Sequence, residues 1–199
     1  EEGEVVLLQT GISLVSIDQA RLNLEEEMIK PYGWDFESVR ADARKAWNNL
    51  LSKIEVSGGS EEDKTKFYTN LYRSYVARAI LSDVNGKYMD PCEVEKQSDS
   101  PMLGCDAFWN TFWNINQIWA MAYPELTSQW VRFLLDMYRD GGLIPRGPSG
   151  HNYTYVMIAA HSTPFIVGAY MKGIRDFDAE LVYEGMRKNA FPGVLMSKA

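Results

Sequence analysis

The distribution of apolar residues along the chain constrains its fold more than any other feature. Two stretches predicted to be helical, residues 107–121 and 153–173, are apolar on nearly every face, whereas residues 35–54, 124–139 and 176–189 are apolar on one face only. A helix that is apolar all round must be buried on both sides, and a two-faced helix can cover it from outside. The alternation predicts a mainly α fold in which inner and outer helices form an array of hairpins, either a solenoid or a closed α/α toroid.

Capping residues place the ends of these helices. Asp35 is the predicted N-cap of the first, the run Ser60-Glu61-Glu62-Asp63 has the spacing of a capping box for a helix over 61–81, and Pro124 suits a first helical position. Gly141-Gly142 ends the helix that begins at Pro124. The long loops 82–105 and 143–152 both follow outer helices, so we expect them to gather at one end of the array, where binding sites are often built.

The N-terminal residues have a different character. Residues 4–17 are rich in Val, Leu and Ile, which predicts a strand, and a lone strand needs partners that this sequence does not supply. Asp18 is the predicted cap of a connector helix. We therefore expect residues 1–30 to be the end of a β domain with a linker helix, and residues 31–199 to be the helical part that follows it in a longer protein.

Composition excludes some partners and leaves others open. The net charge is −7, which argues against nucleic acid, and no apolar run is long enough to span a membrane. The 13% aromatic content suits a surface on which sugars stack, although core packing can also account for it. Cys92 and Cys105 lie in a Pro- and Ser-rich stretch and read equally as two free thiols or as one disulfide.

Two short segments contain the residues that could bind a ligand. Trp109 and Asn110 stand at the start of an apolar helix, where an indole face and an amide could hold a sugar, or where both could belong to the core. The loop 141–155 holds Arg146 between Pro145 and Gly147, which favours a fixed arginine that anchors an oxygen-rich ligand.

Asn152, Tyr153 and His161 follow Arg146 and surround the start of the second apolar helix. His161 and the other histidine of the chain, His151, could each have a structural role instead. Four carboxylates, Asp83, Asp106, Glu125 and Asp140, could serve glycoside hydrolysis, but the sequence does not select a pair.

Several ordered segments resemble glycoside hydrolase family 92, the calcium-dependent exo-acting α-mannosidases. They are GWDFESVRADARKAWNNLLSKIEV (33–56), FYTNLYRSYVARAILSDVNGKY (67–88), the Trp109-Asn110-Thr111 turn, GGLIPRGPSGHNYT (141–154) and HSTPFIVGAYMKGIRDFD (161–178). The resemblance implies an N-terminal β-sandwich followed by an (α/α)6 toroid, of which this chain would supply the first half. It also implies an inverting mechanism and calcium, with the metal ligands and general-base carboxylates beyond residue 199.

The chain departs from the family pattern at two positions. Asn110 stands where family members usually carry Asp in a Trp-Asp-Thr turn, and Tyr153 stands where many carry the general acid in Asn-Glu-Thr. Tyrosine is a poor acid for this step because its ordinary pKa is about 10.

The resemblance therefore predicts a secreted or periplasmic α-mannosidase that acts on mannose-containing glycans and has an altered general acid. This chain would be inactive alone and would pack against the rest of its own protein. Trp109, Asn110, Arg146, Asn152 and His161 would bind the sugar, and Tyr153 would occupy the acid position. The alternative is a glycan-binding protein that keeps the scaffold without catalysis.

Overall fold

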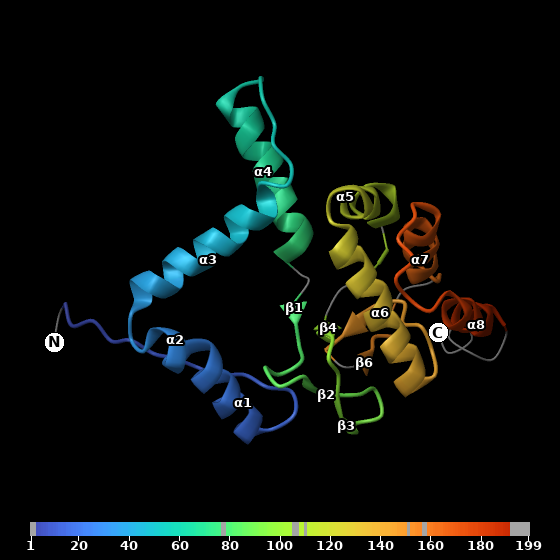
Figure 1. Ribbon diagram of the computed structural model, residues 1–199, viewed down its shortest axis with the longest axis horizontal. Coiled ribbons are helices and arrows are strands. Elements are labelled where there is room, and N and C mark those ends of the chain that lie inside the picture. The colour runs from blue at the N-terminus through green and yellow to red at the C-terminus, as the bar shows by residue number, and fades with distance from the viewer. Residues whose placement is uncertain are drawn as a thin grey trace.

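In the part of the chain that it describes, a computed structural model shows a mainly helical protein with three two-stranded sheets (Figure 1). It describes residues 3–76, 79–104, 108–109, 111–150, 152–156 and 159–191. The helices are α1 (Ile17–Leu24), η1 (Glu25–Ile29), α2 (Lys30–Tyr32), α3 (Phe36–Leu51), α4 (Glu61–Val76), η2 (Thr111–Trp113), α5 (Ile115–Ala122), α6 (Pro124–Gly141), α7 (Ser162–Met171) and α8 (Ala179–Ala190). The strands are β1 (Ala79–Ile80), β2 (Lys87–Met89), β3 (Glu95–Gln97), β4 (Leu103–Gly104), β5 (Pro148–Ser149) and β6 (Asn152–Tyr153).

The helix predicted to follow residues 4–17 is confirmed, but its cap lies two residues earlier than predicted. The hydroxyl of Ser16 accepts a hydrogen bond from Gln19, and Asp18 lies inside the first turn of α1. The π-helical turn η1 joins α1 to α2. Residues 4–16 form no strand within the described part of the chain, and most of their apolar side chains are exposed. That they belong to a β-sandwich stays a prediction.

Helices α3 and α4 form a hairpin, and each of them begins at its predicted N-terminal cap. The carboxylate of Asp35 accepts the amide of Ser38, and Ser60 and Asp63 exchange hydrogen bonds as a capping box. The two helices extend away from the α5–α8 unit (Figure 1). At their near end the hydroxyl of Tyr123, a residue with 0% exposure, donates to the carbonyl of Leu50 over 2.9 Å, which ties α3 to the corner between α5 and α6.

Helix α6 is the centre of the C-terminal unit because it contacts α5, α7 and α8. Its buried residues recur at the spacing of one helix face, and they are Thr127, Trp130, Val131, Leu134 and Tyr138 with their neighbours Ser128, Phe133, Leu135 and Met137. Phe108 packs edge-on against Trp130, and Trp119 against Phe165, so rings from α5, α6 and α7 interlock. Nine aromatic side chains of the described residues are therefore core, whereas nine others, such as Trp34 and Trp113, are exposed.

Two helices begin later than the sequence predicts. Residues 108–109 and 111–114 form a turn and η2 before α5 starts at Ile115, after the capping side chain of Asn114. Residues 153–156 and 159–161 do not join α7, because Tyr153 pairs in β6 and Tyr155 has a φ of 52° that a helix does not allow. Pro164 then falls in the first turn of α7, where a missing amide costs no hydrogen bond. No helix in the described ranges is long and apolar enough to cross a membrane.

A buried polar junction connects the N-terminal helices to the loop after β1. Asn23 and Asp83 are 7% and 5% exposed, and the Asn23 amide donates to Oδ1 of Asp83 over 2.7 Å and to the carbonyl of Ile12 over 2.8 Å. Ser13 donates to the other carboxylate oxygen, and Asn23 accepts from Val84. Buried polar groups in such a network are stabilising only while all partners are present.

Replacing Asn23 with Ala should therefore destabilise the protein. The substitution leaves one oxygen of a buried carboxylate without its donor, and we expect the free energy of unfolding to fall by about 2–3 kcal/mol. Urea denaturation of the intact protein measures this. Asn49→Ala, at an exposed position in α3, is the matched control. Equal stability of the two variants would show that the junction contributes nothing.

Candidate functional site

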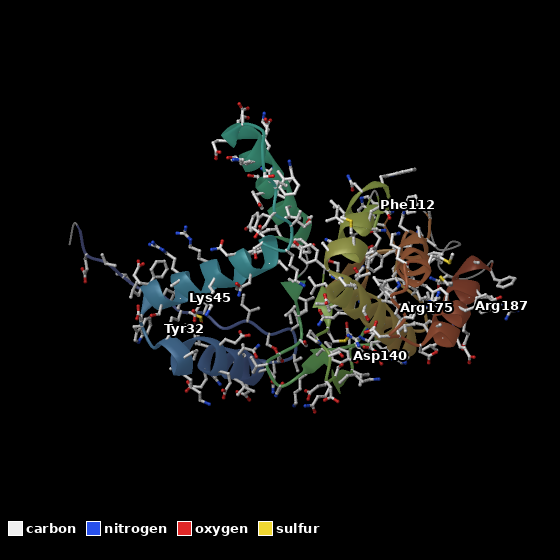
Figure 2. The ribbon with its side chains drawn as sticks, turned by 45° about the horizontal axis from the view of Figure 1, so that its top comes forward. Tyr32, Lys45, Phe112, Asp140, Arg175 and Arg187 are labelled. Atoms are coloured by element: carbon white, nitrogen blue, oxygen red, sulfur yellow. The ribbon has the colours of Figure 1, made fainter. Side chains whose placement is uncertain are left out.

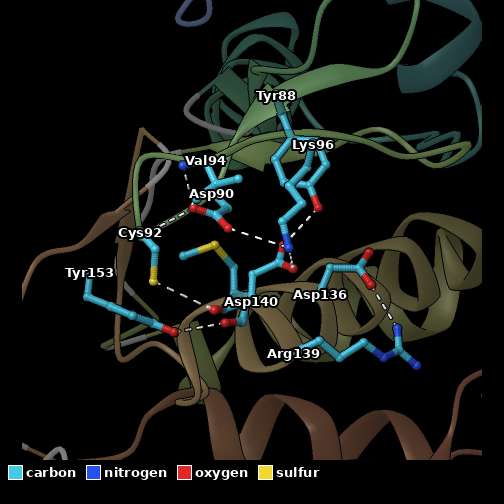
Figure 3. A network of polar contacts seen from close by, with 10 residues as sticks. Tyr88, Asp90, Cys92, Val94, Lys96, Asp136, Arg139, Asp140 and Tyr153 are labelled. Atoms are coloured by element: carbon cyan, nitrogen blue, oxygen red, sulfur yellow. Dashed lines mark hydrogen bonds and ion pairs between the residues drawn. The ribbon is translucent and has the colours of Figure 1, made fainter.

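The candidate site is built around the C-terminal end of α6 and the loop that follows it, called here the α6–α7 loop (residues 142–150 and 152–156). Helix α6 ends at Gly142, which has the left-handed φ of 80° that glycine adopts without strain. Asp140 lies in the last turn, facing the hairpin formed by β2 and β3 (Figure 3). As expected, the two long loops lie together, since the hairpin belongs to one and the α6–α7 loop is the other.

Asp140 is the centre of a polar network that sequence reasoning did not assemble. Its Oδ2 accepts the hydroxyl of Tyr88 over 2.8 Å, and its Oδ1 accepts the ammonium of Lys96 over 3.1 Å (Figure 3). The ammonium also lies 3.6 Å from Oδ2 of Asp90, whose side chain is 3% exposed. The hydrogen bond and charge of Asp140 raise the pKa of Lys96 above its ordinary value, so the cation persists.

Tyr153 approaches the same helix end from the other side. Its hydroxyl lies 2.8 Å from the carbonyl of Met137 and 2.8 Å from that of Leu143, and it accepts the amide of Leu143 over 3.3 Å. A Cβ on Gly141 would lie 2.2 Å from this hydroxyl, so only glycine allows the approach. Burial raises the pKa of Tyr153 well above its ordinary value. These contacts give Tyr153 a structural role and lend no support to the predicted general acid.

Arg146 is buried inside the α6–α7 loop. The residue is 3% exposed, and its Nη2 donates to the carbonyl of Tyr155 over 3.1 Å. The same loop is closed by Thr154, whose hydroxyl and amide both donate to the carbonyl of Gly147. The arginine is fixed, as its Pro and Gly neighbours predict, but it faces the loop backbone instead of the surface.

The remaining predicted binding residues are more dispersed. Asn152 is exposed and accepts its neighbour's amide, whereas Trp109 is half-buried in the turn before η2. His161 is half-buried at the N-cap of α7 and makes no capping bond there. Asn110 lies outside the described residues. Figure 2 places Phe112, three residues after Trp109, well away from Asp140.

The structure thus unites Arg146, Asn152 and Tyr153 on one loop. Across the described part of the chain, no side-chain hydrogen bond connects this loop to Trp109 or to His161. The residues that sequence reasoning missed are Tyr88, Asp90 and Lys96. One sequence signal could have found them. The short segments Lys87-Tyr88-Met89 and Glu95-Lys96-Gln97 lie on either side of the turn signal at Asp90-Pro91, and this arrangement is typical of a hairpin.

The described carboxylates named from the sequence are already engaged. Asp83 belongs to the buried junction, Asp140 to the network, and Glu125 forms an exposed ion pair with Lys53 at 3.6 Å. Asp106 and Cys105 lie outside the described residues. Cys92 is a free thiol that lies 3.8 Å from the carbonyl of Asp140. Within the described ranges, no group of three or more His, Cys, Asp or Glu side chains could hold a metal ion.

Comparison with known proteins identifies relatives over nearly the whole chain. The model of the glycosyl hydrolase family 92 catalytic domain matches residues 19–198. An uncharacterized secreted glycosidase from Arthroderma benhamiae is 28% identical over 188 residues, which cover 93% of this chain and 20% of that protein.

Two solved structures show the same fold. A family GH92 inverting mannosidase from Bacteroides thetaiotaomicron VPI-5482 is 28% identical with a TM-score of 0.76, over 88% of this chain and 24% of that one. A family GH92 α-mannosidase from Bacteroides thetaiotaomicron has a TM-score of 0.81 at 23% identity, over 90% of this chain and 24% of that one. The chain therefore spans about a quarter of the solved relatives it matches.

Tyr153→Phe should destabilise the protein without disturbing its core, because the ring is kept and only the hydroxyl is lost. The half-buried amide and carbonyl of Leu143 lose a partner, and we expect a cost of about 1–3 kcal/mol in unfolding free energy. Urea denaturation measures the change. Tyr155→Phe is the control, since Tyr155 is 42% exposed and packs against Tyr153 at 5.7 Å between ring centroids. A Tyr153→Phe variant as stable as the control would remove the structural role.

Proposed function

The chain belongs to glycosyl hydrolase family 92, and from this we propose that the intact protein is an inverting exo-α-mannosidase acting on α-linked mannosides of glycans. The observation that supports this most strongly is the match of the catalytic-domain model to residues 19–198. The relative that is 28% identical over 88% of this chain is named as an inverting mannosidase, which supports the stereochemistry. A solved relative was also crystallised with mannoimidazole, which supports a mannose-like ligand.

We propose that the carboxylate pair comes from the part of the protein that this chain does not contain. An inverting glycosidase needs one carboxylic acid and one carboxylate about 6.5–9.5 Å apart, with a water between them. Asp83, Glu125 and Asp140 already bind other groups of the chain. This chain would instead supply sugar-binding residues, namely Trp109, Asn110, Asn152 and His161, with Arg146 fixing the loop that carries Asn152.

The fold of the described chain suits such a division. Helices α5 and α7 leave apolar side chains exposed, including Met121 at 76% and Met171 at 74%. Side chains of this kind are usually covered by protein. We propose that they pack against the remaining helices of an (α/α)6 toroid, as inner helices would.

Calcium and location complete the proposal. We assign no step on this chain to calcium. Residues elsewhere in the protein would bind the metal, and the bound metal would help to distort the mannose ring. The described side chains contain no set that fits it. We propose a secreted or periplasmic protein, because the curated relative is named as a secreted glycosidase.

The second candidate function is glycan binding without catalysis. It is favoured by Tyr153, which stands at the acid position that the family resemblance assigns, with a hydroxyl that binds backbone groups instead. If the family acid is absent, two outcomes are open. An enzyme would still hydrolyse substrates with good leaving groups, whereas a binding protein would hydrolyse none.

The intact protein with calcium should hydrolyse an aryl α-mannoside with inversion. Proton NMR during the first minutes should show β-mannose as the initial product, and excess chelator should stop the reaction until calcium is restored. Hydrolysis of the aryl mannoside but not of an α-mannobiose would indicate a missing acid. Initial release of α-mannose would contradict inversion, and binding of mannobiose with no hydrolysis of either substrate would favour the glycan-binding alternative.

Arg146→Ala should lower kcat/KM on the aryl mannoside at least tenfold, which is about 1.4 kcal/mol of transition-state stabilisation. The reason is that the guanidinium holds the carbonyl of Tyr155 and with it the loop. Arg175→Ala is the control, because Arg175 is exposed and stacks on Tyr170 at 4.6 Å. Unchanged kinetics in Arg146→Ala would exclude a role in the site.

A further inference from the structure

The β2–β3 hairpin binds the end of α6 through two carboxylates that are largely removed from water and one cation, Lys96, whose side chain is 40% exposed. The Asp140 side chain is 11% exposed and the Asp90 side chain 3% exposed, and the Lys96 ammonium lies between them at 3.1 and 3.6 Å. The other oxygen of Asp90 accepts the amides of Cys92 and Val94, which fixes the turn of the hairpin. Lys96 is thus the cation that allows two buried carboxylates to lie close together.

The same helix end also determines where the α6–α7 loop begins. Asp140 precedes Gly141 and Gly142, and the amide of Gly142 bonds back to Tyr138 over 2.8 Å. The Tyr153 hydroxyl connects Met137 to Leu143 across this turn. A displacement of Asp140 would therefore be transmitted to both arms of the loop.

Helix α8 holds the loop on its remaining side. The buried amide of Asn189 donates to the carbonyl of Ile144 over 2.7 Å. A Cβ on Gly185 would lie 2.8 Å from Cδ1 of Ile144, so α8 packs closely against the loop. The hairpin is joined to the end of α6, where the loop begins, through polar groups of Tyr88, Cys92 and Lys96 that bind Asp140.

We propose that Lys96 is a positioning residue, which acts through Asp140 to hold the α6–α7 loop in the conformation that binds the sugar. The part of this inference that concerns the sugar rests on the proposed function. The part that concerns the loop rests only on the contacts of Lys96, Asp140 and Tyr153. Lys96 itself does not touch substrate in this account.

Lys96→Met in the intact protein tests the proposal, because it keeps the aliphatic side chain and removes the cation. We expect faster hydrogen exchange in peptides covering residues 142–150 and a KM for the aryl α-mannoside at least fivefold higher, with kcat changed less than twofold. Lys96→Arg should keep hydrogen exchange and KM close to the wild-type values, because arginine can still bridge the two carboxylates. Lys53→Met is the control, since Lys53 pairs with Glu125 at the opposite end of α6.

The outcomes separate the two parts of the proposal. Exchange and KM equal to wild type in Lys96→Met would overturn it, as would faster exchange with an unchanged KM. If Lys96→Met does not fold, Tyr88→Phe is the second variant, because it removes a single bond to Asp140. It should show the same changes in hydrogen exchange and KM, but smaller ones. Wild-type exchange and KM in Tyr88→Phe would overturn the proposal. An intact protein that neither binds nor hydrolyses α-mannosides would refute the proposed function, while the exchange measurement would still decide whether Lys96 holds the loop.

Discussion

The carbonyl groups at the end of α6 are the constraint on which the site depends. The last turn of an α-helix leaves its carbonyls without helical partners, and they must find others if they are buried. Here the carbonyl of Tyr138 accepts the amide of Gly142, that of Asp140 lies beside the Cys92 thiol, and that of Met137 is approached by the Tyr153 hydroxyl. The partners come from two segments, the hairpin and the α6–α7 loop, so satisfying one helix end brings these two segments together.

Two glycines allow the segments around the end of α6 to approach each other closely, and charged side chains fix how the hairpin binds there. Gly141 has no side chain to keep Tyr153 away, and Gly185 has none to keep Ile144 away. The hairpin then binds through Lys96, which offsets the cost of placing Asp90 and Asp140 near each other. A loop that is held on three sides can present polar side chains in a fixed geometry, which is what recognition of a sugar with several hydroxyl groups requires.

Local signals predicted much of the fold, and long-range contacts decided the rest. Asp35, Ser60, Pro124 and Gly142 end or begin helices as their types predict, because capping involves groups only a few residues apart. The start of α7 was predicted nine residues too early, because an apolar run says nothing of the pairing of Pro148 with Tyr153. Lys96 was missed for the same reason, since Asp140 is 44 residues away and no spacing rule connects them.

The family assignment followed from ordered segments of sequence and is confirmed, whereas the roles of single residues were harder to infer. The position of Tyr153 in the family motif predicts a general acid, whereas its contacts show a hydroxyl that holds a helix end. A crystal structure of the intact protein with mannoimidazole and calcium would show directly whether the α6–α7 loop binds the sugar. We predict inhibitor density in contact with the α6–α7 loop and Trp109, with Tyr153 still bound to Leu143. Inhibitor bound elsewhere, with no contact to this loop, would contradict the account.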